Sequence, residues 1–418
     1  ADEIEDPRPW CEIIRQWSTF HPEFSFLPRK FKFAVTGADT DRAAVRVHDI
    51  GLHMRRNDAG ETGFEVIVGG GQGRTPHVGV TINPFVEKAK LLDYLEAIMR
   101  VYNRFGRRDN KYKARIKILV NETGAEEFTR LVEEEFAAQQ SAEKITLPQA
   151  EVDRIEAYFE PPAFEDLPEV SDSFVKASAD DEGFAHWAKT NVRAHKQPGY
   201  GMVTISCKPI GKPPGDVSDT QMEIAADLAE QYSFDDIRIT HEQNMVLPHV
   251  KLDDLYAVYQ ALSKAGLATA NYELISDIIC CPGLDYCNLA NARSIPVAQD
   301  LQNKFADIER QEDIGELKIK ISGCINACGH HHVGHIGILG VDRKGEEFYQ
   351  ITFGGRSDEL ASIGQIAGPG LKQEDVPDAL ERVIEAYRDL RSKPSERFID
   401  VLDRLGHEPF KEALYAGN

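Results

Sequence analysis

Residues 317–329 read LKIKISGCINACG, a short run of alternating residues that ends in glycine and is followed by two cysteines. The alternation predicts a half-buried β-strand over residues 317–322, with its apolar side chains on one face. Residues 31–37 read FKFAVTG and repeat the pattern, glycine included. The sequence therefore predicts two related strands in distant parts of the chain.

The two strands belong to a longer internal repeat. Each strand's glycine is followed at the same distance by a second glycine, Gly51 in the first copy and Gly337 in the second. A turn comes next in each copy, at residues 57–60 and 342–345. Each copy then closes with a strand and a glycine run, FEVIVGGG and YQITFGG. These features in one order predict a duplicated α/β module. Only the second copy has cysteines after its strand.

A proline-rich acidic segment, EPPAFEDLPEVSD at 160–172, predicts a loop and a module boundary. After it, strand and helix patterns alternate in the order β-α-β-β-α, which resembles half of a ferredoxin-like fold. We therefore predict an α+β protein with pseudo-twofold duplicated modules. The predicted domains are a first α/β module at 1–160, a ferredoxin-like half domain at 161–266 and a second module at 267–418.

Composition excludes several classes of protein. The net charge of −21 argues against sequence-independent nucleic-acid binding, which needs a basic surface. The sequence contains no run of 18 or more apolar residues, so it predicts no membrane span. The first residues lack the features of a signal peptide. An odd number of cysteines, seven, disfavours a disulfide framework. We expect a cytoplasmic protein without a membrane or nucleic-acid partner.

Four cysteines form two pairs, Cys281-x5-Cys287 and Cys324-x3-Cys328. Zinc sites usually use closer pairs, whereas a cubane [4Fe–4S] cluster takes four thiolates, the soft ligands that its iron prefers. Structural zinc and buried free thiols remain alternatives. Cys280 adjoins Cys281 and could compete with it as a ligand.

These motifs resemble those of one known family. CCPGLDYC at 280–287 and GCINACG at 323–329 resemble the paired cluster motifs of the sirohaem-dependent nitrite/sulfite reductases, and SFLPRKFK at 25–32 resembles another segment of that family. The resemblance implies a sirohaem next to the cluster. It also implies that Cys281, Cys287, Cys324 and Cys328 ligate the cluster, with Cys328 as the axial ligand of the sirohaem iron as well.

The same resemblance assigns Lys30 and Lys32 to the binding of a small anionic substrate. On a strand, residues i and i+2 point to one face, so both ammonium groups can reach one anion. Preorganised cations would hold sulfite or nitrite and assist proton delivery. The family also has an upstream module with two substrate-binding arginines, which we expect this chain to lack.

Sirohaem carries many carboxylates, so its pocket needs Arg, Lys and backbone N–H donors. Glycine runs beside basic residues are candidates, because successive N–H groups can bind an anion. The segment ITHEQN at 239–244 resembles a haem-facing strand of the family, and the basic stretch 103–117 could line the pocket or receive an acidic donor. The predicted sirohaem-binding residues are Gly70, Gly71, Arg74, Gln243, Asn244, Asn326, Cys328, Gly354 and Gly355.

The implied function is the six-electron reduction of sulfite to sulfide in sulfur assimilation, with nitrite reduction to ammonia as the alternative. A non-catalytic iron–sulfur or zinc protein is the alternative of another class. No GxGxxG fingerprint predicts a flavin or nicotinamide site, so electrons would come from another protein, a ferredoxin or a flavoprotein subunit.

Overall fold

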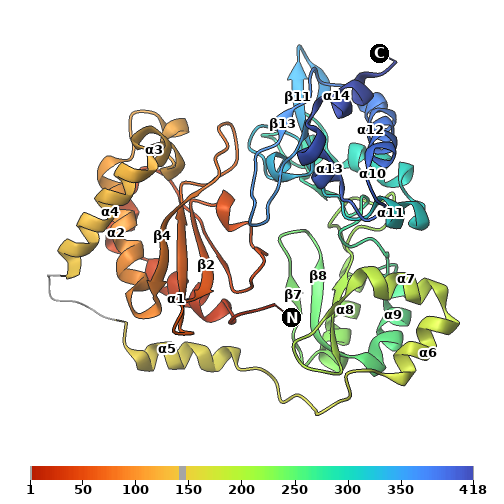
Figure 1. The fold of residues 1–418 in the computed structure, drawn as a ribbon, viewed down its shortest axis with the longest axis horizontal. Coiled ribbons are helices and arrows are strands. Elements are labelled where there is room, and N and C mark those ends of the chain that lie inside the picture. The colour runs from red at the N-terminus through yellow and green to blue at the C-terminus, as the bar shows by residue number, and fades with distance from the viewer. Residues whose placement is uncertain (1, 141–146, 418) are drawn as a thin grey trace. The chain divides into compact units, whose positions relative to one another are not determined.

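The computed structural model of the chain describes residues 2–140 and 147–417 and divides them into two compact units. The N-terminal unit comprises residues 2–161 with 357–362, and the C-terminal unit comprises residues 162–356 with 363–418 (Figure 1). Each unit is described below by itself. The division of the C-terminal unit into a half domain and a cluster-bearing module stays a prediction.

The N-terminal unit is a four-stranded sheet with helices on one face (Figure 1). The sheet has the order β1-β2-β3-β4, parallel between the first two strands and antiparallel elsewhere. Helices α2 and α4 pack against each other and cover β4. The elements are α1 (Arg8–Ser18), β1 (Phe33–Thr36), β2 (Ile50–Arg56), β3 (Thr62–Val68), β4 (Val80–Glu87), α2 (Leu91–Phe105), α3 (Ile116–Thr123), α4 (Ala125–Gln140) and α5 (Gln149–Glu156).

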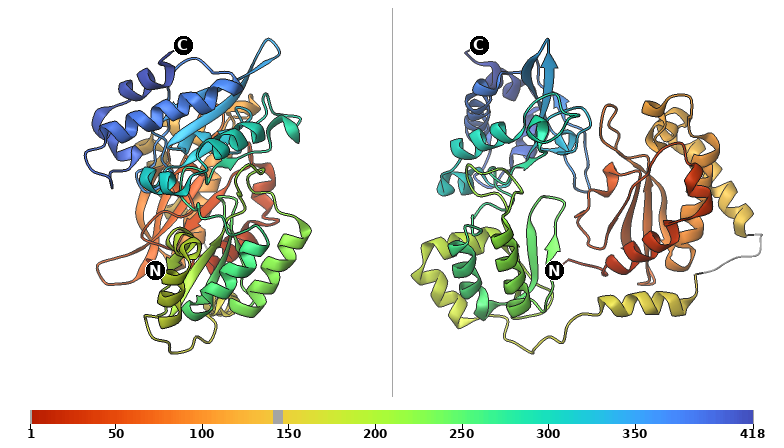
Figure 2. Two further views of the ribbon diagram at one scale, coloured as in Figure 1. Left: turned by 90° about the vertical axis from the view of Figure 1, so that its right-hand side faces the viewer. Right: turned by 180° about the vertical axis from the view of Figure 1, so that it is seen from behind.

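The middle of the chain forms a small two-layer fold within the C-terminal unit. Helices α6 to α9 lie together on one side of an antiparallel sheet of order β5-β6-β8-β7 (Figures 1 and 2). Their apolar faces enclose a core built around Phe184, Trp187 and Leu247. The elements are α6 (Asp172–Asp180), α7 (Glu182–Asn191), β5 (Val192–Ala194), β6 (Tyr200–Ile205), α8 (Asp219–Tyr232), β7 (Arg238–Ile239), β8 (Met245–Lys251) and α9 (Leu255–Lys264).

The rest of the C-terminal unit is a five-stranded sheet of order β13-β12-β11-β10-β9. Helix α12 begins at Val376 and ends at Leu390, as its 3.6-residue apolar period predicts, and its inner face is buried in the core. The elements are β9 (Ile279–Cys280), α10 (Ile295–Lys304), α11 (Ile308–Ile314), β10 (Ile319–Ser322), β11 (Ile336–Arg343), β12 (Glu346–Phe353), β13 (Gln365–Ile366), α12, α13 (Phe398–Leu405) and α14 (Glu408–Tyr415).

The predicted duplication is confirmed by strand register. In the N-terminal unit β1 pairs in parallel with β2 so that Phe33 lies opposite Ile50, and in the C-terminal unit β10 pairs with β11 so that Ile319 lies opposite Ile336. Each partner strand then turns back antiparallel into the next, β3 or β12. The two copies therefore share topology and register as well as sequence pattern.

The copies also share an unusual loop. A 3₁₀ turn separates the two parallel strands in each, η2 (Val45–Val47) and η8 (His331–Val333), and each turn follows a residue with left-handed backbone. These residues are Ala44, with φ 50°, and His330, with φ 57°. Such a conformation is uncommon for residues other than glycine, so its recurrence marks a common structural constraint.

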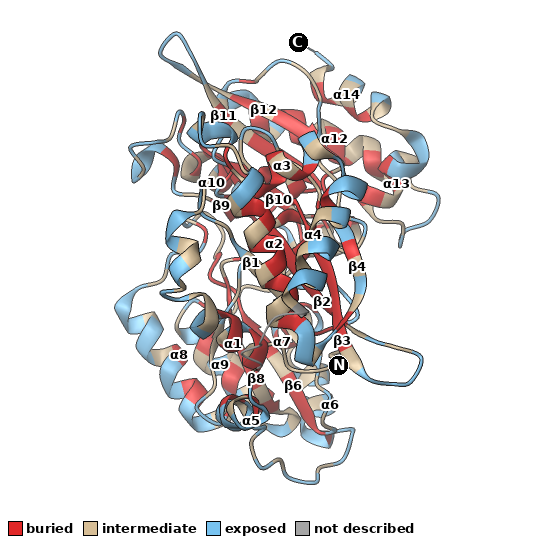
Figure 3. Cartoon of the chain, turned by 90° about the vertical axis from the view of Figure 1, so that its left-hand side faces the viewer, coloured by how far each residue is buried: buried red, intermediate tan, exposed pale blue. Residues whose placement is uncertain are grey.

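The sequence predicts a half-buried strand at 317–322, and this prediction is wrong for the face that was expected to be exposed. All four residues of β10 are buried, because β10 is a central strand with β9 on one side and β11 on the other. In Figure 3 this strand and most of β2 and β3 are buried, while the outer faces of helices such as α8 are exposed. Of the residues that the structure describes, none belongs to a helix long and apolar enough to cross a membrane.

Candidate functional site

The two cysteine segments follow two neighbouring strands and begin at the same end of one sheet. Strands β9 and β10 are parallel neighbours, with Cys280 opposite Ile321, and the N–H of Cys281 donates to the carbonyl of Ile321 over 3.1 Å. The carboxyl ends of parallel neighbours point the same way, so the loop after β9 and the loop after β10 start side by side. The first loop carries Cys281 and Cys287, and the second carries Cys324 and Cys328.

Glycines lock these loops together, backbone against backbone. A Cβ placed on Gly323 would lie 2.5 Å from the carbonyl oxygen of Ala292 and 2.8 Å from the Cα of Gly283, closer than real Cβ contacts allow. Gly283 has a φ of +57°, which also favours glycine. The N–H groups of Asn291 and Ala292 both donate to the Gly323 carbonyl. Neither loop can therefore move without the other.

The neighbours Cys280 and Cys281 have different environments. The side chain of Cys280 is buried, and this burial raises the pKa of its thiol well above the usual value. Its Sγ lies 3.1 Å from the Cys281 carbonyl oxygen, to which it donates. Cys281 is only half-buried, and its Sγ accepts a hydrogen bond from the Gly323 N–H at 3.1 Å. Cys280 is thus a protonated core thiol, whereas Cys281 faces the second cysteine loop.

The remaining cysteines lie on tight turns. Cys287 is half-buried, and its backbone N–H donates to the carbonyl of Gly283. Cys324 is buried and Cys328 is exposed, and between them Ala327 takes a left-handed φ of 58°. The N–H of Gly329 donates to the Ser322 hydroxyl at 3.0 Å and closes the turn. Cys328 therefore stands at the open surface of a compact loop. Asn326, on the same loop, is exposed.

The donor set has the chemistry that an iron–sulfur cluster takes. A cubane offers separate iron corners to four thiolates, and four cysteines on two locked loops supply that kind of ligand. Among residues 2–140 and 147–417 no three Cys, His, Asp or Glu side chains gather closely enough to hold one metal ion.

Of the three histidines that follow Cys328, His331 lies in the protein interior. Its ring contacts that of His332 at a tilt of 40°, with centroids 3.9 Å apart. Burial, with help from the neighbouring histidines, lowers the pKa of His331 to about 3, so the ring is neutral at physiological pH. The carbonyl of His331 lies so close to Gly337 that only glycine fits there, which indicates a packing role.

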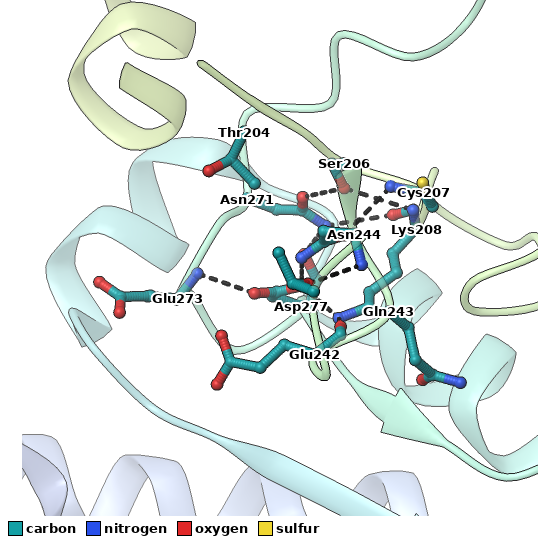
Figure 4. Close-up of polar contacts among 12 residues, drawn as sticks. Thr204, Ser206, Cys207, Lys208, Glu242, Gln243, Asn244, Asn271, Glu273 and Asp277 are labelled. Carbon is teal, nitrogen blue, oxygen red and sulfur yellow. Dashed lines mark hydrogen bonds and ion pairs between the residues drawn. The ribbon is translucent and has the colours of Figure 1, made fainter. Parts of the chain in front are cut away.

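Gln243 and Asn244, predicted to face a haem, have amides bound within the protein. The Gln243 amide donates to the Cys280 carbonyl and accepts from the Cys280 N–H, both at 2.9 Å. Asn244 accepts from the Cys207 N–H at 3.1 Å and donates to Asp277 at 3.2 Å (Figure 4). Gln243 therefore holds strand β9, and Asn244 holds the segment just before it at Asp277.

A buried charge network adjoins this pair and had no clear signal in the sequence. The ammonium of Lys208, fully buried, lies 2.6 Å from Asp277 and also donates to the carbonyl of Glu242 (Figure 4). Lys318 pairs with the Glu242 carboxylate at 3.3 Å. Burial lowers the pKa of Lys320, on β10, to about 8. In the sequence, only Lys318 and Lys320, two charged residues in the segment LKIKIS of an otherwise buried strand, could have indicated the network.

In the N-terminal unit, Lys30 and Lys32 precede the strand rather than lie on it. Strand β1 begins at Phe33, but Lys32 extends the ladder because the Ile50 N–H donates to its carbonyl at 3.1 Å. Phe31 packs against the core between the two exposed lysines. Both lysine side chains are exposed beside the start of β1, and their projection to one side of the chain stays a prediction.

Two N–H groups of the predicted anion cradle have backbone acceptors within the protein. The Gly71 N–H donates to the His77 carbonyl at 2.9 Å, and the Gly354 N–H donates to the His335 carbonyl at 3.1 Å. Gly70 and Gly355 are required for another reason: a Cβ on either would lie within 2.6 Å of two carbonyl oxygens. The glycine runs thus let two backbones approach closely, in the same way in both copies.

The loop that follows Gly71 is held by a buried lysine. The Lys117 ammonium donates to the carbonyls of Gln72 and Thr75, both at 2.6 Å. Burial and then the Arg115 charge lower the pKa of Lys117 to about 8. Arg74 is exposed at the tip of this loop. The basic stretch 103–117 therefore ends in residues with structural partners, while Lys111 and Lys113 are exposed.

Comparison with known proteins agrees with this reading. The family model described as "Nitrite and sulphite reductase 4Fe-4S domain" matches residues 1–140 and 273–417. The "Nitrite/Sulfite reductase ferredoxin-like half domain" matches residues 194–265. One matching solved structure is that of the Mycobacterium tuberculosis NirA protein, with a TM-score of 0.74 and 23% identity over 98% of this chain and 69% of that one. It confirms the fold.

Curated relatives include reductases for both anions. The chain is 26% identical to sulfite reductase [ferredoxin] 1 of Mycolicibacterium paratuberculosis, over 94% of this chain and 65% of the relative. It is 25% identical to the chloroplastic ferredoxin–nitrite reductase of Arabidopsis thaliana, over 92% of this chain and 61% of the relative. The chain thus spans less than two thirds of the length of these relatives.

Proposed function

Because this chain belongs to the nitrite and sulphite reductase 4Fe-4S domain family, we propose that it forms the cluster- and sirohaem-binding part of a sulfite reductase. The overall reaction is the six-electron reduction of sulfite to sulfide. One observation carries the proposal above the others. The two cysteine loops leave neighbouring parallel strands and are locked together at Gly283 and Gly323.

The cluster ligands in this proposal are Cys281, Cys287, Cys324 and Cys328. The family domain implies the [4Fe–4S] cluster, and the sirohaem is inferred from the family. Cys328 is the proposed shared ligand, and its exposed position supports this because a shared thiolate must be open to a second cofactor. When bound, the coupled cluster and sirohaem would pass electrons from a donor protein to the substrate.

The chain's own residues bind the substrate and move protons. Lys30 and Lys32 would hold the anion by their charge, since two nearby exposed cations suit a small oxyanion. Each oxygen of the anion leaves as water, so protons must be delivered to those oxygens, and the lysine ammonium groups are the proposed donors. The proposed sirohaem-facing groups are Asn326, Arg74, Gly70, Gly71, Gly354 and Gly355.

Nitrite is the second candidate substrate, because relatives of both names match at similar identity. Both anions are small and need the same cations and electrons. The names of these relatives support a ferredoxin as electron donor, and a flavoprotein subunit is the alternative. A non-catalytic iron–sulfur or zinc protein is the outcome to be excluded.

The test begins with the visible spectrum, iron and acid-labile sulfide of this chain and of one extended at its N-terminus. A sirohaem band with iron and sulfide supports the proposal, and sulfite and nitrite turnover with a reduced ferredoxin then decides the substrate. Cys328→Ser should lose the sirohaem signal, whereas Cys11→Ser, which alters a cysteine far from the motifs in sequence, should not. Zinc in place of iron, or no haem band in either chain, would refute it.

A further inference from the structure

The side-chain amide of Gln243 binds the backbone of strand β9 in the way that a neighbouring strand would. Among the strands that the structure describes, β9 is at the edge of its sheet and has only β10 as a neighbour. The Cys281 N–H points toward β10, so the N–H and carbonyl of Cys280 point the other way. Gln243 meets both groups with its own donor and acceptor, each at 2.9 Å. A primary amide can do this because it carries both functions, as a peptide does.

The turn that presents Gln243 is itself held firmly. Gln243 has a left-handed φ of 61°, and the Thr240 N–H donates to the Asn244 carbonyl across the turn at 2.9 Å. The next residue, Asn244, is 1% exposed and is bound to Cys207 and Asp277. A left-handed residue other than glycine persists only where its surroundings fix it, and here hydrogen bonds on both sides do so.

We propose that Gln243 is a positioning residue that fixes the backbone before Cys281 and so sets the reduction potential and the retention of the cluster. The inference rests on the proposed function, because it takes Cys281 as a cluster ligand. Cys281 is the residue next to the clamped Cys280, and its Sγ accepts the Gly323 N–H at 3.1 Å. Hydrogen bonds to sulfur and solvent access are among the factors that set the potential of such clusters.

The substitution Gln243→Met keeps the length of the side chain and removes both hydrogen bonds. Gln243→Asn keeps both functions on a side chain one methylene shorter and tolerates the left-handed backbone, so it serves if the Met variant does not fold. The matched control is Gln221→Met. Gln221 caps α8 in the same small fold, where its amide donates to the Ala265 carbonyl at 3.0 Å and no hydrogen bond joins it to β9.

The experiment is a redox titration of the holoprotein followed by the electron paramagnetic resonance of the cluster, with cluster loss in air timed separately. Gln243→Met should shift the midpoint potential and speed cluster loss about tenfold or more, and Gln243→Asn should do so less. Gln221→Met should match the parent protein. An unchanged potential and an unchanged rate of cluster loss in Gln243→Met would overturn the inference. Loss of the haem band alone would also overturn it, because Gln243 would then be a haem contact.

A second readout separates this inference from the proposed function. In the metal-free chain, alkylation of the Cys281 thiol reports the freedom of its backbone whether or not a cluster ever forms. Faster alkylation in Gln243→Met than in Gln221→Met supports the clamp, and equal rates contradict it. If the parent protein takes up no cluster, the proposed function fails, and the alkylation rates still decide whether Gln243 fixes this strand.

Discussion

The backbone N–H of Gly323 donates a hydrogen bond to the Sγ of Cys281 over 3.1 Å, and so ties the loop after β10 to a thiol of the loop after β9. The contact depends on an approach that only glycine permits. It makes Gly323 part of the cluster site although glycine has no side chain to bind with.

We therefore expect Gly323→Ala to lose most of its iron. The added Cβ would lie 2.5 Å from the Ala292 oxygen, so the loops would have to separate and the N–H···S contact with Cys281 would lengthen. Iron and acid-labile sulfide measured per protein chain test this. The control is Gly345→Ala at a hairpin tip, where nothing lies within 4 Å of the new Cβ. It should cost stability through its positive φ and keep its iron. Full iron in Gly323→Ala would contradict the steric argument.

The adjacent cysteines should respond oppositely to substitution. Cys280→Ala should keep the cluster, because the Cys280 thiol is buried, burial raises its pKa, and it already donates to a carbonyl. Cys281→Ala should lose the cluster, because it removes a ligand. Iron content and the visible spectrum of the two variants, prepared in parallel, distinguish these outcomes. Loss of iron in Cys280→Ala with retention in Cys281→Ala would reverse the assignment.

The buried pair of Lys208 and Asp277 should be strongly coupled. Lys208→Met leaves the Asp277 carboxylate without its cation, which costs about 3–5 kcal/mol when such a pair is buried. The double variant with Asp277→Asn should recover part of that loss, since the uncompensated charge is gone. Urea unfolding gives the free energies for a double-mutant cycle, and it is monitored by tryptophan fluorescence, to which buried Trp187 contributes.

A surface ion pair provides the comparison for this cycle. Lys176 and Asp180 lie 2.8 Å apart on α6, with side chains 79% and 63% exposed. Water screens such a pair, so Lys176→Met should leave the free energy of unfolding nearly unchanged. Equal effects of Lys176→Met and Lys208→Met would show that burial does not strengthen the inner pair.

The duplication was readable from sequence because it rests on local pattern. Alternating residues, two glycines at fixed spacing and a turn recur, and each has a local physical cause. Burial on the second face of β10 was not readable, because Lys320 looked like a solvent-facing residue. Its burial depends on Glu242 and other residues distant in sequence.

Two other features show the same limit. The apolar pattern of residues 86–102 predicts a helix, but helix α2 begins at Leu91, because Val86 belongs to strand β4 and a short 3₁₀ turn joins the strand to the helix. The hydrogen bonds of Gln243 to Cys280 join residues 37 apart. No propensity or period encodes such a contact, so the sequence placed Gln243 near the cofactors without revealing what its amide binds.

Asp41 gives a prediction for pH. Burial raises the pKa of its carboxyl to about 6, although the N–H groups of Ala43 and Val45 donate to it. A carboxyl whose folded pKa is raised binds its proton more tightly when folded. Its contribution to stability is therefore full below the unfolded pKa, near 4, and is lost as pH rises toward 6. The loss amounts to about 2–3 kcal/mol above that range.

The side chain of Asp41→Asn cannot ionise, so the fall in the free energy of unfolding that Asp41 causes over this range should disappear in the variant. Relative to the parent protein, the variant should gain about 2–3 kcal/mol between pH 4 and pH 7 on top of any constant offset from the lost bond to Val45. Urea unfolding at several pH values measures the difference. Asp58→Asn, at an exposed turn position, should show a flat difference. A flat difference for Asp41→Asn as well would mean that the Asp41 carboxyl is better solvated than its burial implies.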